Sequence, residues 1–166
     1  MEKIILILIS IVLLIVDNSF APFFAIHGAY PSLLLTFAIA YSILNKKEDA
    51  VFIGVVSGIL QDIYFYNVFG VNSLLNLFLC IVASIIGESI VRNKRLIPTI
   101  SIFVITIVKF FGIFIIFYFM DITIGVDFIE IIIMGLYNSI MMFFIYKIVF
   151  RQLDKKNNNQ QWRFKW

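Results

Sequence analysis

The sequence predicts an all-α integral membrane protein, built as a bundle of six transmembrane helices. Of its 166 residues, 62% are hydrophobic and 14% are charged, whereas a soluble domain has roughly 45–50% and about 25%. One soluble domain of this length could not bury so many large side chains. Six long apolar segments and a one-sided distribution of Lys and Arg lead to the same fold class. An ordinary soluble enzyme is therefore excluded.

The apolar segments form one predicted transmembrane domain, residues 1–150. The first lacks an A-x-A-like cleavage site and is followed by five more, so we expect it to remain as a helix. The second apolar run, Pro31 to Leu44, is too short to cross about 30 Å of hydrocarbon unless it begins near Gly28 or the bilayer thins there. All three prolines lie at segment ends, where a missing amide costs least. The predicted spans are residues 4–20, 28–44, 50–66, 71–90, 97–120 and 127–150.

The basic residues set the orientation of these spans. Every Lys and Arg except Lys109 falls on one side of a six-span arrangement. The connections on the other side, residues 18–30, 67–70 and 121–126, contain none. Because Lys and Arg accumulate in cytoplasmic loops, both termini are predicted to be cytoplasmic.

Residues 151–166 form a basic tail that we expect to be disordered or to lie at the membrane surface. The tail contains an Asn/Gln-rich run, Asn157 to Gln161, and both tryptophans of the chain. Such a composition is typical of a solvated or interfacial segment. The candidates for contact with the membrane surface or with a cytoplasmic partner are Arg92, Lys94, Arg95, Trp162, Arg163 and Trp166.

Small and polar residues line one face of the third segment and one face of the fourth. Each residue of a helix advances by 100°, which places a GxxxG pair, Gly54 and Gly58, on the first of these faces. Small residues let another helix approach closely in lipid, and Asn side chains can hydrogen-bond between helices. We expect the two segments to meet each other, and we expect a partner's transmembrane helix to pack on the same residues. The candidates for this packing are Gly54, Ser57, Gly58, Asn72 and Asn76; Ala50, Gln61, Asp62, Cys80, Ala83 and Gly87 share the two faces.

Three ionisable residues lie deep within the spans. Asp17, Asp62 and Lys109 are each about 18–20 Å from the basic side of the membrane. An isolated charge at this depth is costly, so Lys109 is expected to pair with Asp62 or Asp17, as a structural pair or as part of a ligand or proton path. Glu88 lies near a span end, four residues before Arg92, and is expected to form an ion pair with it. The predicted buried polar and charged cluster comprises Asp17, Gln61, Asp62 and Lys109.

The last two segments also have a polar face each. Thr99, Thr106 and Gly112 share the face of Lys109, which indicates that this face points into the bundle. The sixth segment aligns Glu130, Met134, Tyr137, Asn138 and Met141, which is more typical of a bundle core than of a site.

The sequence lacks the motifs of an enzyme or a metalloprotein. It has no phosphate-binding loop, nucleophile elbow, HExxH or dinucleotide fingerprint. One cysteine, Cys80, and one histidine, His27, exclude a disulfide framework and a His/Cys metal cluster. The basic residues lie beside apolar spans, which indicates membrane topology and not nucleic-acid binding. We expect no catalytic activity, no cofactor and no metal.

Two stretches of the sequence carry a pattern of glycines and prolines that is typical of one membrane protein family. The run GVVSGILQDIYFYNVFGVNSLL, Gly54 to Leu75, is similar to the family pattern of a G-x3-G-x3-D helix, a short loop and a Gly-led next helix. The upstream run FAPFFAIHGAYPSLLLTFAIAYSIL, Phe20 to Leu44, is also similar, with prolines before the loop and at the start of the second span. By these residues the chain resembles the rod shape-determining protein MreD family, and its length, its six spans and its basic tail agree with that family.

The resemblance implies a noncatalytic component of the bacterial elongation (rod) complex in the inner (cytoplasmic) membrane. Its partner would be MreC, and through MreC it would be linked to MreB, to RodA and to the elongation penicillin-binding transpeptidase. The family is considered similar in fold to the substrate-binding subunits of energy-coupling-factor transporters, although fold does not fix function. A homo-oligomer remains open.

Two other functions remain as alternatives. One is a transporter subunit that binds a small molecule around Asp17, Asp62, Lys109 and Glu130. The bulky, branched first segment counts against it, because such subunits typically show small residues on their first helix. The other alternative is a protein that handles a lipid-linked cell-wall precursor, with the buried charges as its headgroup site.

Overall fold

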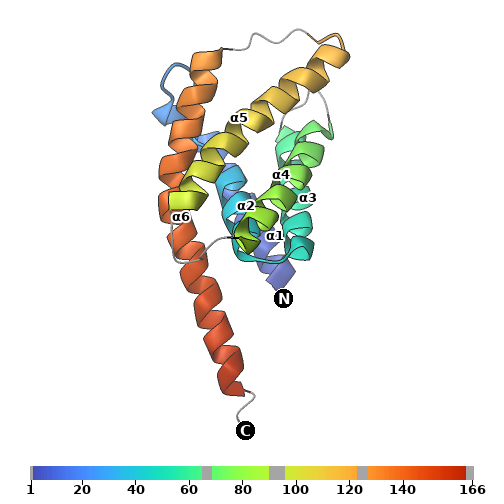
Figure 1. The fold of residues 1–166 in the computed structure, drawn as a ribbon. Helices are drawn as coiled ribbons and strands as arrows, with labels where there is room; N and C mark the ends of the chain where they lie inside the picture. Colours follow the sequence, from blue (N-terminus) through green and yellow to red (C-terminus); the bar gives the residue numbers. More distant parts are fainter. Residues whose placement is uncertain (1, 65–68, 90–95, 123–126, 164–166) are drawn as a thin grey trace.

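The computed structural model is a helical bundle and describes residues 2–64, 69–89, 96–122 and 127–163 (Figure 1). It contains six α-helices in the predicted order, together with one turn of 3-10 helix after the first. The elements are α1 (Glu2–Ser19), η1 (Ala21–Phe24), α2 (Leu33–Leu44), α3 (Lys47–Tyr64), α4 (Val71–Glu88), α5 (Leu96–Phe119) and α6 (Phe128–Arg163).

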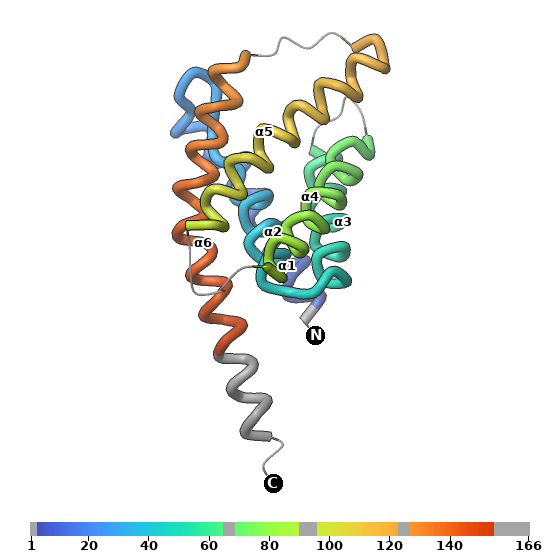
Figure 2. Tube along the Cα trace, in the orientation of Figure 1, coloured from blue at the N-terminus to red at the C-terminus, as the bar shows by residue number. Residues whose placement is uncertain are grey.

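Helix α2 is the centre of the bundle. It packs against all five other α-helices, and ten of its twelve residues are buried. The extended hydrophobic core is formed by α2 together with residues of the surrounding helices, such as Ile53, Cys80, Ile102 and Met142. Helices α3 and α4 lie side by side, while α5 crosses the bundle obliquely and meets α6 at one end (Figure 2). An almost uniformly apolar helix such as α2 is expected at a position surrounded by protein.

Three of the described helices are long and apolar enough to cross a membrane. These are α4, α5 and the part of α6 up to Asp154, and α2 is a shorter apolar helix. Large aliphatic and aromatic side chains are exposed along the outer faces of the bundle. Because a soluble protein rarely exposes apolar surface on this scale, the chain is a membrane protein.

The second helix begins later than expected. Helix α2 starts at Leu33, whereas the sequence analysis expected the span to begin near residue 28. His27 and Gly28 have positive φ angles of 49° and 82° and form a tight turn closed by Ile26 and Ala29. Pro31 also disfavours helical backbone at the residue before it. The helix begins after the proline, with Ser32 as its N-cap.

The last helix is longer than expected. Helix α6 has 36 residues and continues to Arg163, so the tail predicted as disordered or interfacial is helical over most of its length. The sequence after residue 150 contains no Gly or Pro. Adding residues to an existing helix avoids the cost of nucleation, and the membrane part of α6 provides that nucleus.

Several predicted surface residues cannot be placed. Arg92, Lys94, Arg95 and Trp166 lie outside the described residues, and Trp162 and Arg163 are described only as part of the α6 backbone. The expected Glu88–Arg92 pair is therefore untested. Glu88 instead forms an ion pair with Lys47, with 3.6 Å between Oε1 and Nζ.

Candidate functional site

A buried network of polar side chains joins all six α-helices. Each helix, or the residue that caps it, contributes at least one member, and most members are fully or almost fully buried. In hydrocarbon surroundings, polar side chains have to find partners inside the protein. The members of this polar network are Asp17 (α1), Ser32 (N-cap of α2), Gln61 (α3), Asn76 (α4), Thr106 and Lys109 (α5) and Asn138 (α6).

Asp17 holds the N-terminus of α2. Its Oδ1 accepts a hydrogen bond from the backbone N–H of Leu33 (2.7 Å), and its Oδ2 accepts one from that of Leu34 (2.9 Å). The Ser32 hydroxyl also donates to Asp17 Oδ2, at 3.3 Å. The first N–H groups of a helix have no partner within the helix and carry a partial positive charge. A carboxylate from α1 thus satisfies the start of a helix that begins inside the bundle.

Gln61 connects four helices through its side-chain amide. Its Oε1 accepts hydrogen bonds from Lys109 Nζ (2.6 Å) and from Asn76 Nδ2 (2.9 Å). Its Nε2 donates to the hydroxyl of Ser32, at 3.4 Å. Asn76 also donates to Ser57 Oγ at 3.3 Å, and its Oδ1 is a buried atom without a partner among the described residues. Gln61 is therefore the hub of the polar network.

Lys109 has a different partner from the one that the sequence predicted. It was expected to pair directly with Asp62 or Asp17, but its Nζ donates to the neutral Gln61 and forms no ion pair with either carboxylate. Asp17 still belongs to the same network, because Ser32 and Gln61 lie between it and Lys109. The expectation of a direct ion pair is wrong because both carboxylates are used by helix N-termini.

Asn138 closes the network on the side of α6. Its Oδ1 accepts a hydrogen bond from the backbone N–H of Ser32 (2.9 Å), and its Nδ2 donates to Thr106 Oγ1 (3.1 Å). The Thr106 hydroxyl donates in turn to the carbonyl of Ile102. One amide thus ties α5 and α6 to the start of α2.

Asp62 lies outside the polar network and caps another helix. Its carboxylate accepts hydrogen bonds from the backbone N–H groups of Asn72 (2.9 Å) and Ser73 (2.8 Å) and from the Ser73 hydroxyl. It therefore holds the N-terminus of α4 as Asp17 holds that of α2. The four residues expected to form one buried cluster thus divide into two sites, one around Asp62 and one that joins Asp17, Gln61 and Lys109.

The small residues of α3 pack against α4 of the same chain. A Cβ atom added to Gly54 would lie 2.9 Å from Leu77 Cα, and one added to Gly58 would overlap the backbone of Ser73. The predicted meeting of α3 and α4 is confirmed. The expected contact of a partner's helix with this face is corrected, because Gly54, Ser57 and Gly58 are already buried by α4.

Substitutions of Gln61 should show whether its side-chain oxygen, and not only the shape of the side chain, stabilises the protein. Gln61→Leu removes the acceptor for both Lys109 and Asn76, so we expect it to destabilise the protein by about 2 kcal/mol. Gln61→Glu keeps an acceptor oxygen for both donors, and a carboxylate forms a stronger hydrogen bond with an ammonium group. Thermal unfolding of the purified variants in detergent should therefore give a clearly lower midpoint for Gln61→Leu than for Gln61→Glu. Equal midpoints for both variants would contradict the role of Gln61 as a hub.

Several residues of the polar network were not predicted from the sequence. Ser32 was not among the candidates, although a Ser that follows Pro and precedes an apolar run is a known signal for a helix N-cap. Thr106 and Asn138 were placed on interior faces but not in the site. The helical period shows which way a residue points, but not which residue of another helix faces it.

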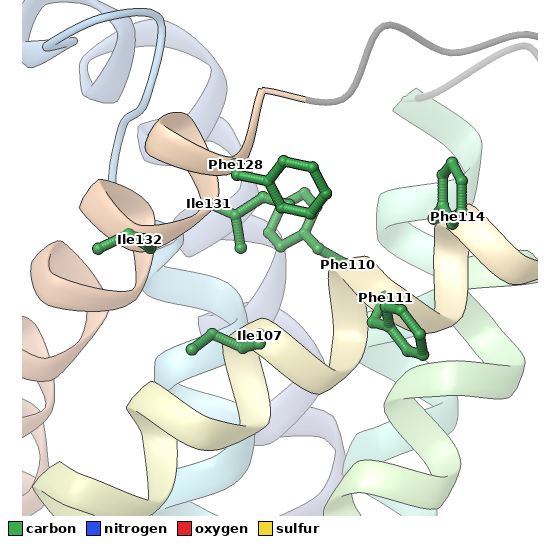
Figure 3. A pocket seen from close by; sticks show the side chains of 7 residues that line it. All are labelled: Ile107, Phe110, Phe111, Phe114, Phe128, Ile131 and Ile132. Atoms are coloured by element: carbon green, nitrogen blue, oxygen red, sulfur yellow. The ribbon is translucent and has the colours of Figure 1, made fainter.

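An apolar groove of about 310 Å³ lies between α5 and α6 (Figure 3). Four phenylalanines and three isoleucines line it, and Phe110 of α5 lies beside Phe128 and Ile131 of α6. No polar side chain is among its lining residues within the described chain. The groove is lined by Ile107, Phe110, Phe111, Phe114, Phe128, Ile131 and Ile132.

Neither the polar network nor the site around Asp62 suggests a metal centre. Within the described parts of the chain, no three His, Cys, Asp or Glu side chains lie close enough together to hold a metal ion. The carboxylates of Asp17 and Asp62 are bonded to backbone N–H groups, which leaves the network suited to holding helices in place.

Comparison with known proteins gives a match to one protein family. The model of the rod shape-determining protein MreD family matches residues 2–152. No curated protein and no solved structure matches the chain. The matched region includes α1 to α5, α6 as far as residue 152 and every member of the polar network.

Proposed function

Because the chain belongs to the rod shape-determining protein MreD family, we propose that it is a noncatalytic membrane component of the bacterial rod complex that binds MreC. Through MreC it would act on MreB, RodA and the elongation penicillin-binding transpeptidase. The described helices are joined by short connections, so apolar helix surfaces are the main surface that they offer to other membrane proteins. A protein of this kind acts by binding and positioning its partners.

We propose that all six helices cross the bacterial inner membrane, with both termini in the cytoplasm. Both termini lie at the same end of the bundle (Figure 1). Every Lys and Arg except Lys109 belongs to that end of the predicted topology, which is the distribution of a cytoplasmic side. A fold similar to that of the energy-coupling-factor substrate-binding subunits belongs to the same proposal.

We propose that MreC docks in the α5–α6 groove. The observation that carries this choice is the concentration of aromatic side chains there, since aromatic residues dominate the binding energy of protein interfaces. The face of Gly54 and Gly58 is not available, because α4 covers it. A partner's apolar segment in the groove would cover Phe111 and Phe128, which are both largely exposed.

The groove can be tested by truncating its exposed side chains. The double variant Phe111→Ala/Phe128→Ala should lose about tenfold or more in MreC binding, because each buried aromatic anchor of an interface contributes about 1–2 kcal/mol. The measurement is the amount of MreC that copurifies with the tagged protein from its own host in native lipid.

The matched control is Phe144→Ala, which truncates a similarly exposed phenylalanine of α6 outside the groove. This variant should retain MreC. If the double variant and the control both retained MreC fully, the groove would not be the binding site. If no MreC copurified even with the unaltered protein, the proposed function itself would fail.

A further inference from the structure

The chain between α1 and α2 forms an apolar elbow that is unusually exposed. We define the elbow as residues 20–26, which have the sequence FAPFFAI and contain no charged or polar side chain. Phe20, Phe23, Phe24 and Ile26 are each more than half exposed, and Phe23 reaches 84%. Exposure of four large apolar side chains to water is unfavourable, so we expect an apolar environment around this loop.

The position of the elbow along α1 and α6 indicates that this environment is the hydrocarbon core of the membrane. Helix α1 has 18 residues and is therefore about 27 Å long, which is shorter than the roughly 30 Å of the hydrocarbon core. The Tyr137 hydroxyl of α6 donates a hydrogen bond to the carbonyl of Phe24, at 2.9 Å. Tyr137 follows Phe128, the first residue of α6, by nine positions, or about 13 Å of helix. The elbow therefore lies beside α6, well below its first turn (Figure 1).

The backbone of the elbow is suited to a hydrocarbon environment. Irregular backbone is tolerated in lipid only when its polar groups have partners within the protein. The N–H groups of Phe20, Phe23, Ala25 and Ile26 donate to the carbonyls of Val16, Phe20, Pro22 and Ala29, at 2.9 to 3.2 Å. Pro22 has no N–H to satisfy. This internal pairing lets the elbow lie in hydrocarbon.

A cavity of about 480 Å³ lies between the elbow and α6. Its surface is apolar apart from a few polar atoms, among them those of Tyr137 and the backbone. Such a space is costly to fill with water and is suited to the hydrocarbon chain of a lipid. The cavity is lined by Phe23, Phe24, Ala25, Ile26, Pro31, Tyr137 and Met141.

We propose that the elbow is immersed in the bilayer, in the leaflet at the end of the bundle opposite the two termini. Phospholipid acyl chains cover its phenylalanines and fill the cavity beside α6. The elbow is thus a lipid-binding surface that links α1, the start of α2 and α6. It is separate from the α5–α6 groove and does not depend on MreC.

Tryptophan fluorescence tests directly whether lipid surrounds the elbow. The chain has two tryptophans, both in the tail, so Phe23→Trp is made in a Trp162→Phe/Trp166→Phe background, with Phe24→Trp as a second probe. The full chain is reconstituted into phosphatidylglycerol/phosphatidylethanolamine vesicles with or without brominated acyl chains. Phe144→Trp, in an exposed position in the middle of the membrane part of α6, is the lipid-facing control, and Glu48→Trp, in the first turn of α3 at the basic end, is the aqueous control.

The two quenchers distinguish the possible surroundings. We expect brominated lipid to quench both elbow probes as strongly as Phe144→Trp, and aqueous iodide to quench them far less than Glu48→Trp. Strong quenching by iodide without quenching by brominated lipid would overturn the proposal, because the elbow would then face water. Protection from both quenchers would overturn it as well, because a second copy of the chain would then be covering the elbow.

Discussion

Gly87→Ala is expected to be among the most destabilising single substitutions in this protein. Gly87 of α4 faces the backbone of α2, and an added Cβ atom would overlap the carbonyl group of Ile43. Backbone atoms cannot turn aside as a flexible side chain can, so the two helices would have to move apart. Overpacking of a core commonly costs about 1–3 kcal/mol, and we expect a loss of about 3 kcal/mol here. A lower unfolding midpoint of the purified protein in detergent measures this loss.

Gly112→Ala is the matched control for this prediction. The added Cβ atom would lie 2.8 Å from Leu75 Cδ2, which is the end of a flexible side chain. The leucine can adopt another rotamer, so we expect a much smaller change in the unfolding midpoint. If Gly87→Ala unfolded at the same temperature as the unaltered protein, the close approach of α2 and α4 would be incorrect.

Asp17→Ala should have an effect of similar size for an electrostatic reason. Without the carboxylate, the buried N–H groups of Leu33 and Leu34 have no acceptor. A buried donor without a partner costs about 1–3 kcal/mol, so the expected loss of stability is about 3 kcal/mol. Asp17→Asn keeps one acceptor oxygen and should lose less than Asp17→Ala. The unfolding midpoint in detergent is again the measurement.

Asp127→Ala tests whether burial is the reason for the large loss of stability expected of Asp17→Ala. Asp127 Oδ1 accepts a hydrogen bond from the N–H of Ile129 at the start of α6, in the same kind of contact but in an exposed position. An exposed N-cap contributes about 1 kcal/mol, and water can replace the lost acceptor. The explanation by burial would be contradicted if Asp17→Ala and Asp127→Ala were equally mild.

The sequence predicted the faces of the helices better than their contacts. The period of small and polar residues identified the interior faces of α3 and α4, because each face follows from 100° steps along one helix. The partner of Lys109 could not be predicted in this way, since it depends on how helices are rotated and shifted against each other. Charge complementarity favoured Asp62 or Asp17 as that partner. In the structure, both carboxylates accept hydrogen bonds from backbone N–H groups. A comparison of side-chain charges does not consider these backbone donors.

The ends of the helices were predicted with mixed success. Helices α1, α4 and α5 begin or end close to the expected residues, where a change from apolar to polar composition marks the boundary. The start of α2 was placed too early, because an apolar composition from Gly28 onward hides the turn made by His27 and Gly28. The end of α6 was placed too early, because a polar composition was interpreted as loss of structure. Composition indicates where the membrane ends, but a helix can continue into water.

In the proposed topology, the length of α6 determines how far the protein reaches from the membrane. Its 36 residues correspond to about 54 Å of helix, and its end extends beyond the other helices of the bundle (Figure 1). The family match covers residues 2–152, and the last turns of α6 follow it. A flexible tether would let its end sample many heights above the lipid surface. A continuous helix acts as a stiff spacer, and any protein bound at its tip would be held at a nearly constant distance from the bilayer.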